Sequence, residues 1–197
     1  MKNIKAVCSD IDGTLLNSIR DLSPRLVNTV TSLPSNFPVI LASSRMPDAM
    51  RHLLKDLGKN SQPLISYNGG YVLSSTGEIL EDVSITVSLV EKILRLTERS
   101  EVHVSLYQGE NWFEEKDDYW SQREIRNTKV QCTWMKGLEV VDLWSKGNSG
   151  AHKVMCMGPS QEISWLFGEL HLEHSNDLHL YRSSDTYLEI APKAISK

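Results

Sequence analysis

The chain has 197 residues, of which 40% are apolar, which is enough to bury a core and form one large or two small domains. With 21 Lys and Arg against 25 Asp and Glu, its net charge of −4 gives no broad basic surface for nucleic acid or an anionic membrane. The amino-terminal residues run into a β-prone segment without the apolar region of a signal peptide, and no run reaches membrane-spanning length. We therefore expect a cytoplasmic protein with no nucleic-acid or membrane partner.

The cysteines give no sign of a disulfide framework or a zinc site. Cys8, Cys132 and Cys156 are scattered, and no two of them have Cys-x-x-Cys spacing. We expect all three to be small buried hydrophobic residues.

The segment 5–16 carries the clearest chemical signal. A β-prone run ends in two carboxylates, Asp10 and Asp12, and Gly13 and Thr14 then turn the chain away. Alternate residues of a strand point to one face, so both carboxylates should project together at the carboxyl end, where open α/β sheets place ligands. A bound divalent cation or a proton on one carboxylate would relieve their repulsion.

An Asp-x-Asp-Gly string also occurs in calcium loops and in ordinary Asp/Gly turns. A calcium loop needs further oxygen ligands at fixed positions ending in Glu, and Asn17, Ile19 and Asp21 supply only part of that set. The sequence around Asp10 therefore fits a calcium loop poorly.

A second apolar strand also ends in polar residues. Ser23 and Pro24 open a predicted helix, and the apolar run 39–42, typical of a strand covered on both faces, stops at Ser43-Ser44-Arg45. A further helix is expected from Pro47 to Leu57, with Gly58 ending it. The order so far is βαβα, which predicts a parallel sheet.

A third strand is predicted at residues 64–67, followed by Asn68-Gly69-Gly70 and a hairpin that begins at residues 71–73. Asn68 and Gly69 suit a type I′ turn, which needs positive φ angles. The turn conformation alone is therefore one explanation of the Asn68-Gly69 pair.

The strings Asp10-Ile-Asp12-Gly13-Thr14-Leu15 and Ser43-Ser44-Arg45 resemble the first and second motifs of the haloacid dehalogenase superfamily of phosphotransferases. Within that superfamily the second motif and Ser66-Tyr67-Asn68-Gly69-Gly70 resemble the Cof-like branch, although Ser44 stands where that branch usually has Gly. The resemblance implies an α/β fold, with a doubly wound Rossmann-like core and an inserted α+β cap domain.

The same resemblance implies a role for each motif residue. Asp10 would attack phosphorus to form an aspartyl-phosphate, Asp12 would act as acid and base, and Mg²⁺ would bind at Asp10 and Asp12. Ser43 would be catalytic by holding the phosphoryl group. The expected substrate-binding residues are Thr14, Ser44, Arg45, Asn68 and Gly69.

From about Asp82 the pattern changes to that of an α+β insertion with an antiparallel sheet. We expect helices over 88–96, 118–126 and 160–170, and β-prone runs near 102–107, 112–113, 130–134, 153–157, 178–181 and 187–190. The resemblance implies a large, type IIB cap over residues 83–187, with a core formed by residues 1–82 and 188–197. In the family this cap covers the phosphoryl site and sets substrate specificity.

Residues 188–197 resemble the segment by which Cof-like proteins return from cap to core. The lysine that ends it is the family's third motif, and Lys197 matches it better than Lys193 does. Its ammonium would neutralise the nucleophile and the incoming phosphate. The family's fourth motif, Gly-Asp-x-x-Asn-Asp, does not follow, so the chain is expected to be truncated before it.

These features favour Mg²⁺-dependent hydrolysis of a small phosphorylated metabolite, such as a sugar phosphate, with weak or no activity in the 197-residue chain. A phosphomutase of related fold is the rival enzyme. The other alternative is a catalytically inactive phosphate-binding or regulatory module, because the fourth motif is absent. We also expect possible self-association through an exposed edge of the core sheet.

Overall fold

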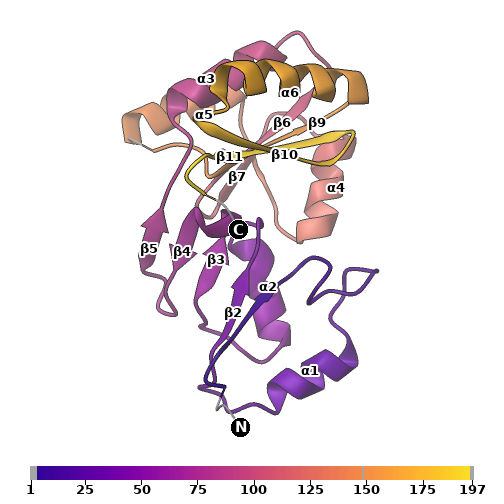
Figure 1. The fold of residues 1–197 in the computed structure, drawn as a ribbon, viewed down its shortest axis with the longest axis vertical. Helices are drawn as coiled ribbons and strands as arrows, with labels where there is room; N and C mark the ends of the chain where they lie inside the picture. The colour runs from indigo at the N-terminus through magenta and orange to yellow at the C-terminus, as the bar shows by residue number, and fades with distance from the viewer. Residues whose placement is uncertain (1–3, 148, 196–197) are drawn as a thin grey trace. The chain divides into compact units, whose positions relative to one another are not determined.

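The computed structural model describes residues 4–147 and 149–195, which form two compact units (Figure 1). The first unit reaches to Asp82 and the second begins at Val83. Each has a sheet of its own.

The first unit is a five-stranded sheet with two α-helices, in the strand order β1-β2-β3-β4-β5. The β1, β2 and β3 strands are parallel, as the βαβα pattern predicts, and β4 and β5 add to them antiparallel. The elements are β1 Val7–Asp10, α1 Pro24–Thr31, β2 Val39–Ala42, α2 Asp48–Asp56, β3 Leu64–Ser66, the short 3-10 helix η1 Tyr67–Gly69, β4 Tyr71–Leu73 and β5 Ile79–Asp82.

Local sequence explains where these elements begin. Ser23 caps α1 by accepting a hydrogen bond from the Leu26 backbone N–H at 3.2 Å, and Pro24 occupies the first turn. Val39 and Leu41 of β2 are buried, whereas β1 is exposed or half-buried along its length. Among the described residues β1 pairs only with β2, so it forms an edge of this sheet.

The second unit is a six-stranded sheet in the order β10-β11-β9-β6-β7-β8, antiparallel except for the β7–β8 pair. Figure 1 shows α3, α5 and α6 together on one side of this sheet, with α4 apart from them. The elements are α3 Val87–Thr97, β6 His103–Gln108, β7 Asn111–Glu114, α4 Tyr119–Thr128, β8 Thr133–Trp134, α5 Gly137–Gly147, β9 Lys153–Met157, α6 Ser160–His174, β10 Leu178–Ser184 and β11 Tyr187–Pro192.

The register of the second sheet separates an apolar face from a polar one. Leu106, Val154 and Ile190 face each other across three strands and belong to the core that the helices cover. The alternate residues of β6, such as His103 and Ser105, point to the opposite face. Charged side chains are therefore buried on that second face.

The α/β fold class is confirmed, and two details differ from the expectation. The helix α5 was missed, because its first residue is a glycine whose backbone N–H is capped by Glu115, 22 residues earlier, at 3.2 Å. Residues 188–192, expected in the core, pair with both β9 and β10 inside the second sheet. The boundaries of the cap expected over 83–187 need correction at this end, because β11 buries Leu188 and Ile190 there.

Candidate active site

The carboxyl ends of β1 and β2 bring the two strongest sequence motifs to one edge of the first sheet. Asp10 pairs in register with Ala42, so Asp10 and Ser43 lie at neighbouring strand ends. The Asp10 side chain is half-buried, and its Oδ1 accepts a hydrogen bond from the Ile11 backbone N–H at 2.8 Å. One carboxylate is thus fixed at the edge where α/β sheets bind ligands.

The turn after Asp10 is built on Ile11, which is fully buried. Its carbonyl accepts hydrogen bonds from the backbone N–H groups of Thr14 at 3.4 Å and of Leu15 and Leu16, each at 3.0 Å. Gly13 has a φ of +76°, a left-handed conformation that suits glycine. This turn leaves Asp12 and Thr14 exposed beside Asp10.

Arg45 holds Asp12 through a bidentate ion pair. Its Nε donates to one carboxylate oxygen of Asp12 at 2.9 Å and its Nη2 to the other at 2.8 Å. The Arg45 side chain is 10% exposed and that of Asp12 49%. Two parallel bonds from a planar guanidinium fix the carboxylate in position as well as neutralise it.

Ser43 is almost fully buried and links three segments through its backbone and hydroxyl. Its N–H donates to Ile65 and its carbonyl accepts from the Asn68 N–H, both at 2.9 Å. Its hydroxyl oxygen accepts from the Arg45 backbone N–H at 3.3 Å. These bonds fix the loop after β2 against the loop after β3.

Asn68 and Gly69 occupy a tight turn with positive φ angles of 57° and 102°. The N–H of Gly70 closes it by donating to the Tyr67 carbonyl at 3.1 Å. This is the geometry of a type I′ turn, so one reason for Asn-Gly at this point is conformational. The turn also places Asn68 directly beside Ser43.

The structure therefore brings Asp12 to Arg45 and Ser43 to Asn68 at one end of the sheet, with Asp10 on the adjacent strand. Ser44 is half-buried in the same loop. Lys197 lies outside the described residues. The catalytic, substrate-binding and metal roles of these residues stay predictions.

The family resemblance implies a substrate-binding role for Arg45, and nothing in the sequence indicates its pairing with Asp12. The partners are 33 residues apart, and only the pairing of β1 with β2 makes them neighbours. An arginine that directly follows a strand end, parallel to a strand ending in carboxylates, is the signal that could have found it.

The described residues hold no group of three or more His, Cys, Asp or Glu side chains able to bind a metal ion. Asp10 and Asp12 nevertheless suit Mg²⁺, which is usually held by one or two carboxylates together with water and substrate phosphate. Both oxygens of Asp12 accept from Arg45 in this arrangement, so Asp12 would have to release Arg45 to bind a metal ion.

Comparison with known proteins identifies the family. Residues 7–197 match the family described as haloacid dehalogenase-like hydrolase. The chain belongs to this family. The resemblance seen in the motifs and the expected hydrolase class are thereby confirmed.

Relatives in the haloacid dehalogenase-like family agree with the match. An HMP-PP phosphatase of Yersinia enterocolitica is 24% identical over 95% of this chain and 67% of its own length. A putative phosphatase of Haemophilus influenzae is 28% identical over 98% of this chain and 71% of its own length. A haloacid dehalogenase-like hydrolase from Bacteroides thetaiotaomicron shares the fold, with a TM-score of 0.87 at 22% identity over 99% of this chain and 73% of that one.

Two further expectations concern other parts of the chain. Of the cysteines, Cys156 is buried as expected, but Cys8 is exposed because β1 is an edge strand, and Cys132 is half-buried. Over the residues that the structure covers, we find no helix with the length and apolar character needed to span a membrane.

Proposed function

We propose that the chain carries the catalytic motifs of a Mg²⁺-dependent phosphatase for small phosphomonoesters. The observation that supports this best is the placement of Asp10 and Asp12 at the carboxyl end of β1, next to Ser43 and Arg45 after β2. Family membership and the phosphatase names of the relatives agree with it.

In the proposed reaction Asp12 enters in its protonated form, released from the bidentate pair with Arg45. An oxygen of Asp10 attacks phosphorus, the ester P–O bond breaks, and the leaving oxygen takes the proton from Asp12. Asp12 then removes a proton from water, whose oxygen attacks the phosphorus of the aspartyl-phosphate and releases phosphate, restoring Asp10. Mg²⁺, when bound, would withdraw charge from the phosphoryl oxygens.

The neighbouring groups have proposed supporting roles. The Ser43 hydroxyl would donate a hydrogen bond to the phosphoryl group, and Asn68 would orient the phosphoryl group. Arg45 would hold Asp12 in position once Asp12 has lost its proton, and its guanidinium would bring positive charge to a site that must admit an anion. A sugar phosphate is the substrate class we propose, in a cytoplasmic setting.

A generic chromogenic phosphomonoester with Mg²⁺ tests the proposal. We expect Asp10→Asn to lower turnover by about 10⁴-fold or more, because an amide is too weak a nucleophile to replace the carboxylate in forming the covalent intermediate. Asp21→Asn is the matched control, since Asp21 is exposed and keeps its backbone contacts, and it should behave like the wild type. Equal turnover by Asp10→Asn and wild type would overturn the nucleophile assignment.

A phosphate-binding module is the second candidate, because the described residues hold no group of three or more side chains able to bind a metal ion, and Asp12 is paired with Arg45. Calorimetry with inorganic phosphate separates the two. Binding without turnover of any phosphomonoester supports the module, whereas release of phosphate supports the phosphatase. Transfer of the phosphoryl group to another position of a sugar would indicate a phosphomutase.

We also propose that β1 mediates self-association of this chain. The strand pairs on one side only among the described residues, and Ile4 and Val7 are 69% and 41% exposed. An unpaired strand edge with apolar side chains favours pairing with a second copy. Sedimentation should show an association that Val7→Lys weakens, and a monomer at all concentrations would exclude it.

A further inference from the structure

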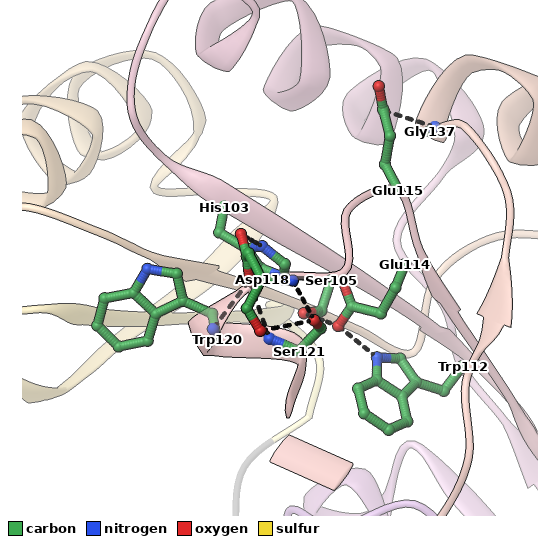
Figure 2. Close-up of polar contacts among 9 residues, drawn as sticks. All are labelled: His103, Ser105, Trp112, Glu114, Glu115, Asp118, Trp120, Ser121 and Gly137. Atoms are coloured by element: carbon green, nitrogen blue, oxygen red, sulfur yellow. Dashed lines mark hydrogen bonds and ion pairs between the residues drawn. The ribbon is translucent and has the colours of Figure 1, made fainter. Parts of the chain in front are cut away.

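A second group of charged side chains lies inside the second unit, at the start of α4 (Figure 2). His103 and Ser105 come from β6, Glu114 from β7, and Asp118 is the N-cap of α4. His103, Ser105 and Glu114 are at most 5% exposed. The proposed phosphatase reaction uses none of them.

Both ring nitrogens of His103 face a carboxylate. Nδ1 lies 2.9 Å from Oδ2 of Asp118, and Nε2 lies 2.7 Å from Oε2 of Glu114, the latter an ion pair rather than a hydrogen bond. A neutral imidazole has one N–H group, so at one of the two contacts a nitrogen lone pair would face a carboxylate oxygen. Only the imidazolium suits both contacts.

The other oxygens of the two carboxylates are also engaged. Oε1 of Glu114 accepts from the Ser105 hydroxyl at 2.5 Å and from the Trp112 indole N–H at 2.8 Å. Oδ1 of Asp118 accepts from the backbone N–H groups of Trp120 at 2.8 Å and Ser121 at 3.1 Å. Each carboxylate therefore has a hydrogen-bond donor on the oxygen that does not face His103.

The pKa shifts of His103 and Asp118 favour a protonated imidazole beside an ionised carboxylate. Burial alone would lower the pKa of His103, but its contacts with Glu114 and Asp118 outweigh this and raise the pKa above the ordinary value. Burial would raise the pKa of Asp118, but hydrogen bonds from Ser121 and His103 lower it. The cluster therefore holds one cation between two anions.

Charged residues also line the cavity beside His103, namely Arg95, Glu98, Glu115, Lys116 and Lys136. The ion pairs of His103 itself are with Glu114 and Asp118. Met157 of β9 is the partner of His103 in the register. Burial, and after it the negative charge of Glu114, raises the pKa of the Cys132 thiol to about 11, so the thiol stays neutral. Asp117, which also acts on Cys132, is exposed.

Buried polar residues and contacts with one aromatic ring attach α4 to the rest of the second unit. The buried residues of α4 are Ser121 and Thr128, both polar, so no apolar side chain anchors it fully. Trp120 contacts the Tyr187 ring edge-on at 5.5 Å, and the guanidinium of Arg123 lies over that ring at 5.1 Å. Its amino-terminal end is held by Asp118 and thereby by His103.

We propose that protonated His103 is a latch that holds the start of α4 on the sheet, and that the latch opens as His103 loses its proton. Because the pKa of His103 is higher in the closed state, the latch is fully formed below the ordinary histidine pKa and is lost as pH rises through the raised pKa. Between these two values the opening equilibrium should rise about tenfold per pH unit, since one proton is released.

Limited trypsin proteolysis of the full chain tests the latch. Cleavage after Arg123 and Arg126 of α4 is measured from slightly acid to slightly alkaline pH, relative to Arg95 in α3, which corrects for the pH dependence of the protease itself. In the wild type the ratio should rise about tenfold per pH unit over the transition. In His103→Gln it should be high at every pH, because glutamine carries no charge.

His171→Gln is the matched control, because His171 is exposed on α6, and it should follow the wild type. A flat ratio in the wild type, or the same pH profile in His103→Gln, would overturn the latch. Should His103→Gln fail to fold, NMR of the wild type decides. The His103 ring must titrate above the ordinary histidine range, and the signals of the α4 amides must change over the same pH interval. A ring that titrates in the ordinary range, or α4 signals that do not change with it, overturns the proposal.

Discussion

The first unit leaves the carboxylate of Asp12 49% exposed at a strand end, whereas the second buries the Glu114 carboxylate completely. Asp12 pairs with the guanidinium of Arg45, while Glu114 is surrounded by His103, Ser105 and Trp112. An exposed carboxylate keeps its hydration and remains accessible to a ligand. A buried one must have its full set of partners, because desolvation of an unpaired charge costs several kcal/mol.

The exposed carboxylate of the first unit is therefore suited to reaction with a ligand, and the buried cluster of the second unit to stabilising the fold. Substitutions in the first unit should change reactivity more than stability, and substitutions in the second should do the opposite. All five tryptophans, at positions 112, 120, 134, 144 and 165, lie in the second unit, so their fluorescence reports its unfolding specifically.

After Asp10→Asn, the largest effect is expected for Asp12→Asn. Loss of the acid and base should lower the turnover of a chromogenic phosphomonoester by about 10²- to 10⁴-fold. The tryptophan unfolding midpoint should stay unchanged. Asp48→Asn, which alters an exposed ion pair with Arg51 in the same unit, is the control for the change in charge. Full activity of Asp12→Asn would show that another residue is the general acid and base.

Next in size is Glu114→Leu, which leaves a buried imidazole and two hydrogen-bond donors without their partner. We expect the free energy of unfolding of the second unit to fall by roughly 3 to 5 kcal/mol. Denaturant titration followed by tryptophan fluorescence measures it, with Glu110→Leu at an exposed position as the control. A decrease in the free energy of unfolding no larger than that of Glu110→Leu would mean that the cluster contributes nothing to stability.

Two glycines allow the same substitution in each unit. A Cβ on Gly150 would lie 2.0 Å from the Ile85 carbonyl oxygen, so Gly150→Ala must displace backbone and should cost about 3 kcal/mol by tryptophan fluorescence. A Cβ on Gly13 meets nothing within 4 Å, so only its φ of +76° is strained.

For Gly13→Ala we therefore expect a smaller cost of about 1 kcal/mol. Because the first unit has no tryptophan, hydrogen exchange of the β2 amides is the suitable measurement. A cost equal to that of Gly150→Ala would show that the turn after Asp10 is packed more tightly than its open surroundings suggest.

Thiol labelling compares the two units without any substitution, and its expected effect is the smallest. Cys8 is exposed in the first unit and should react with a maleimide at neutral pH. Burial raises the pKa of Cys156 to about 12, so it should react only after unfolding. Mass spectrometry of the labelled peptides distinguishes the two, and early labelling of Cys156 would show that the second core opens readily.

The sequence by itself determined the features that depend on short spacings. The carboxylates at positions 10 and 12, the apolar run 39–42 and the Asn68-Gly69 turn are local patterns, and each specifies its strand or turn without help from distant residues. That is why the parallel order of β1 to β3 and the position of the candidate site could be predicted.

Tertiary structure alone decided the partners of the charged groups. Arg45 meets Asp12 only because β1 and β2 pair in one register, and His103 meets Asp118 only where α4 crosses the polar face of its sheet. The start of α5 likewise depends on Glu115, a distant residue, and not on a local cap. Such contacts join residues 15 to 33 positions apart, and no pattern along the chain records the register that brings them together.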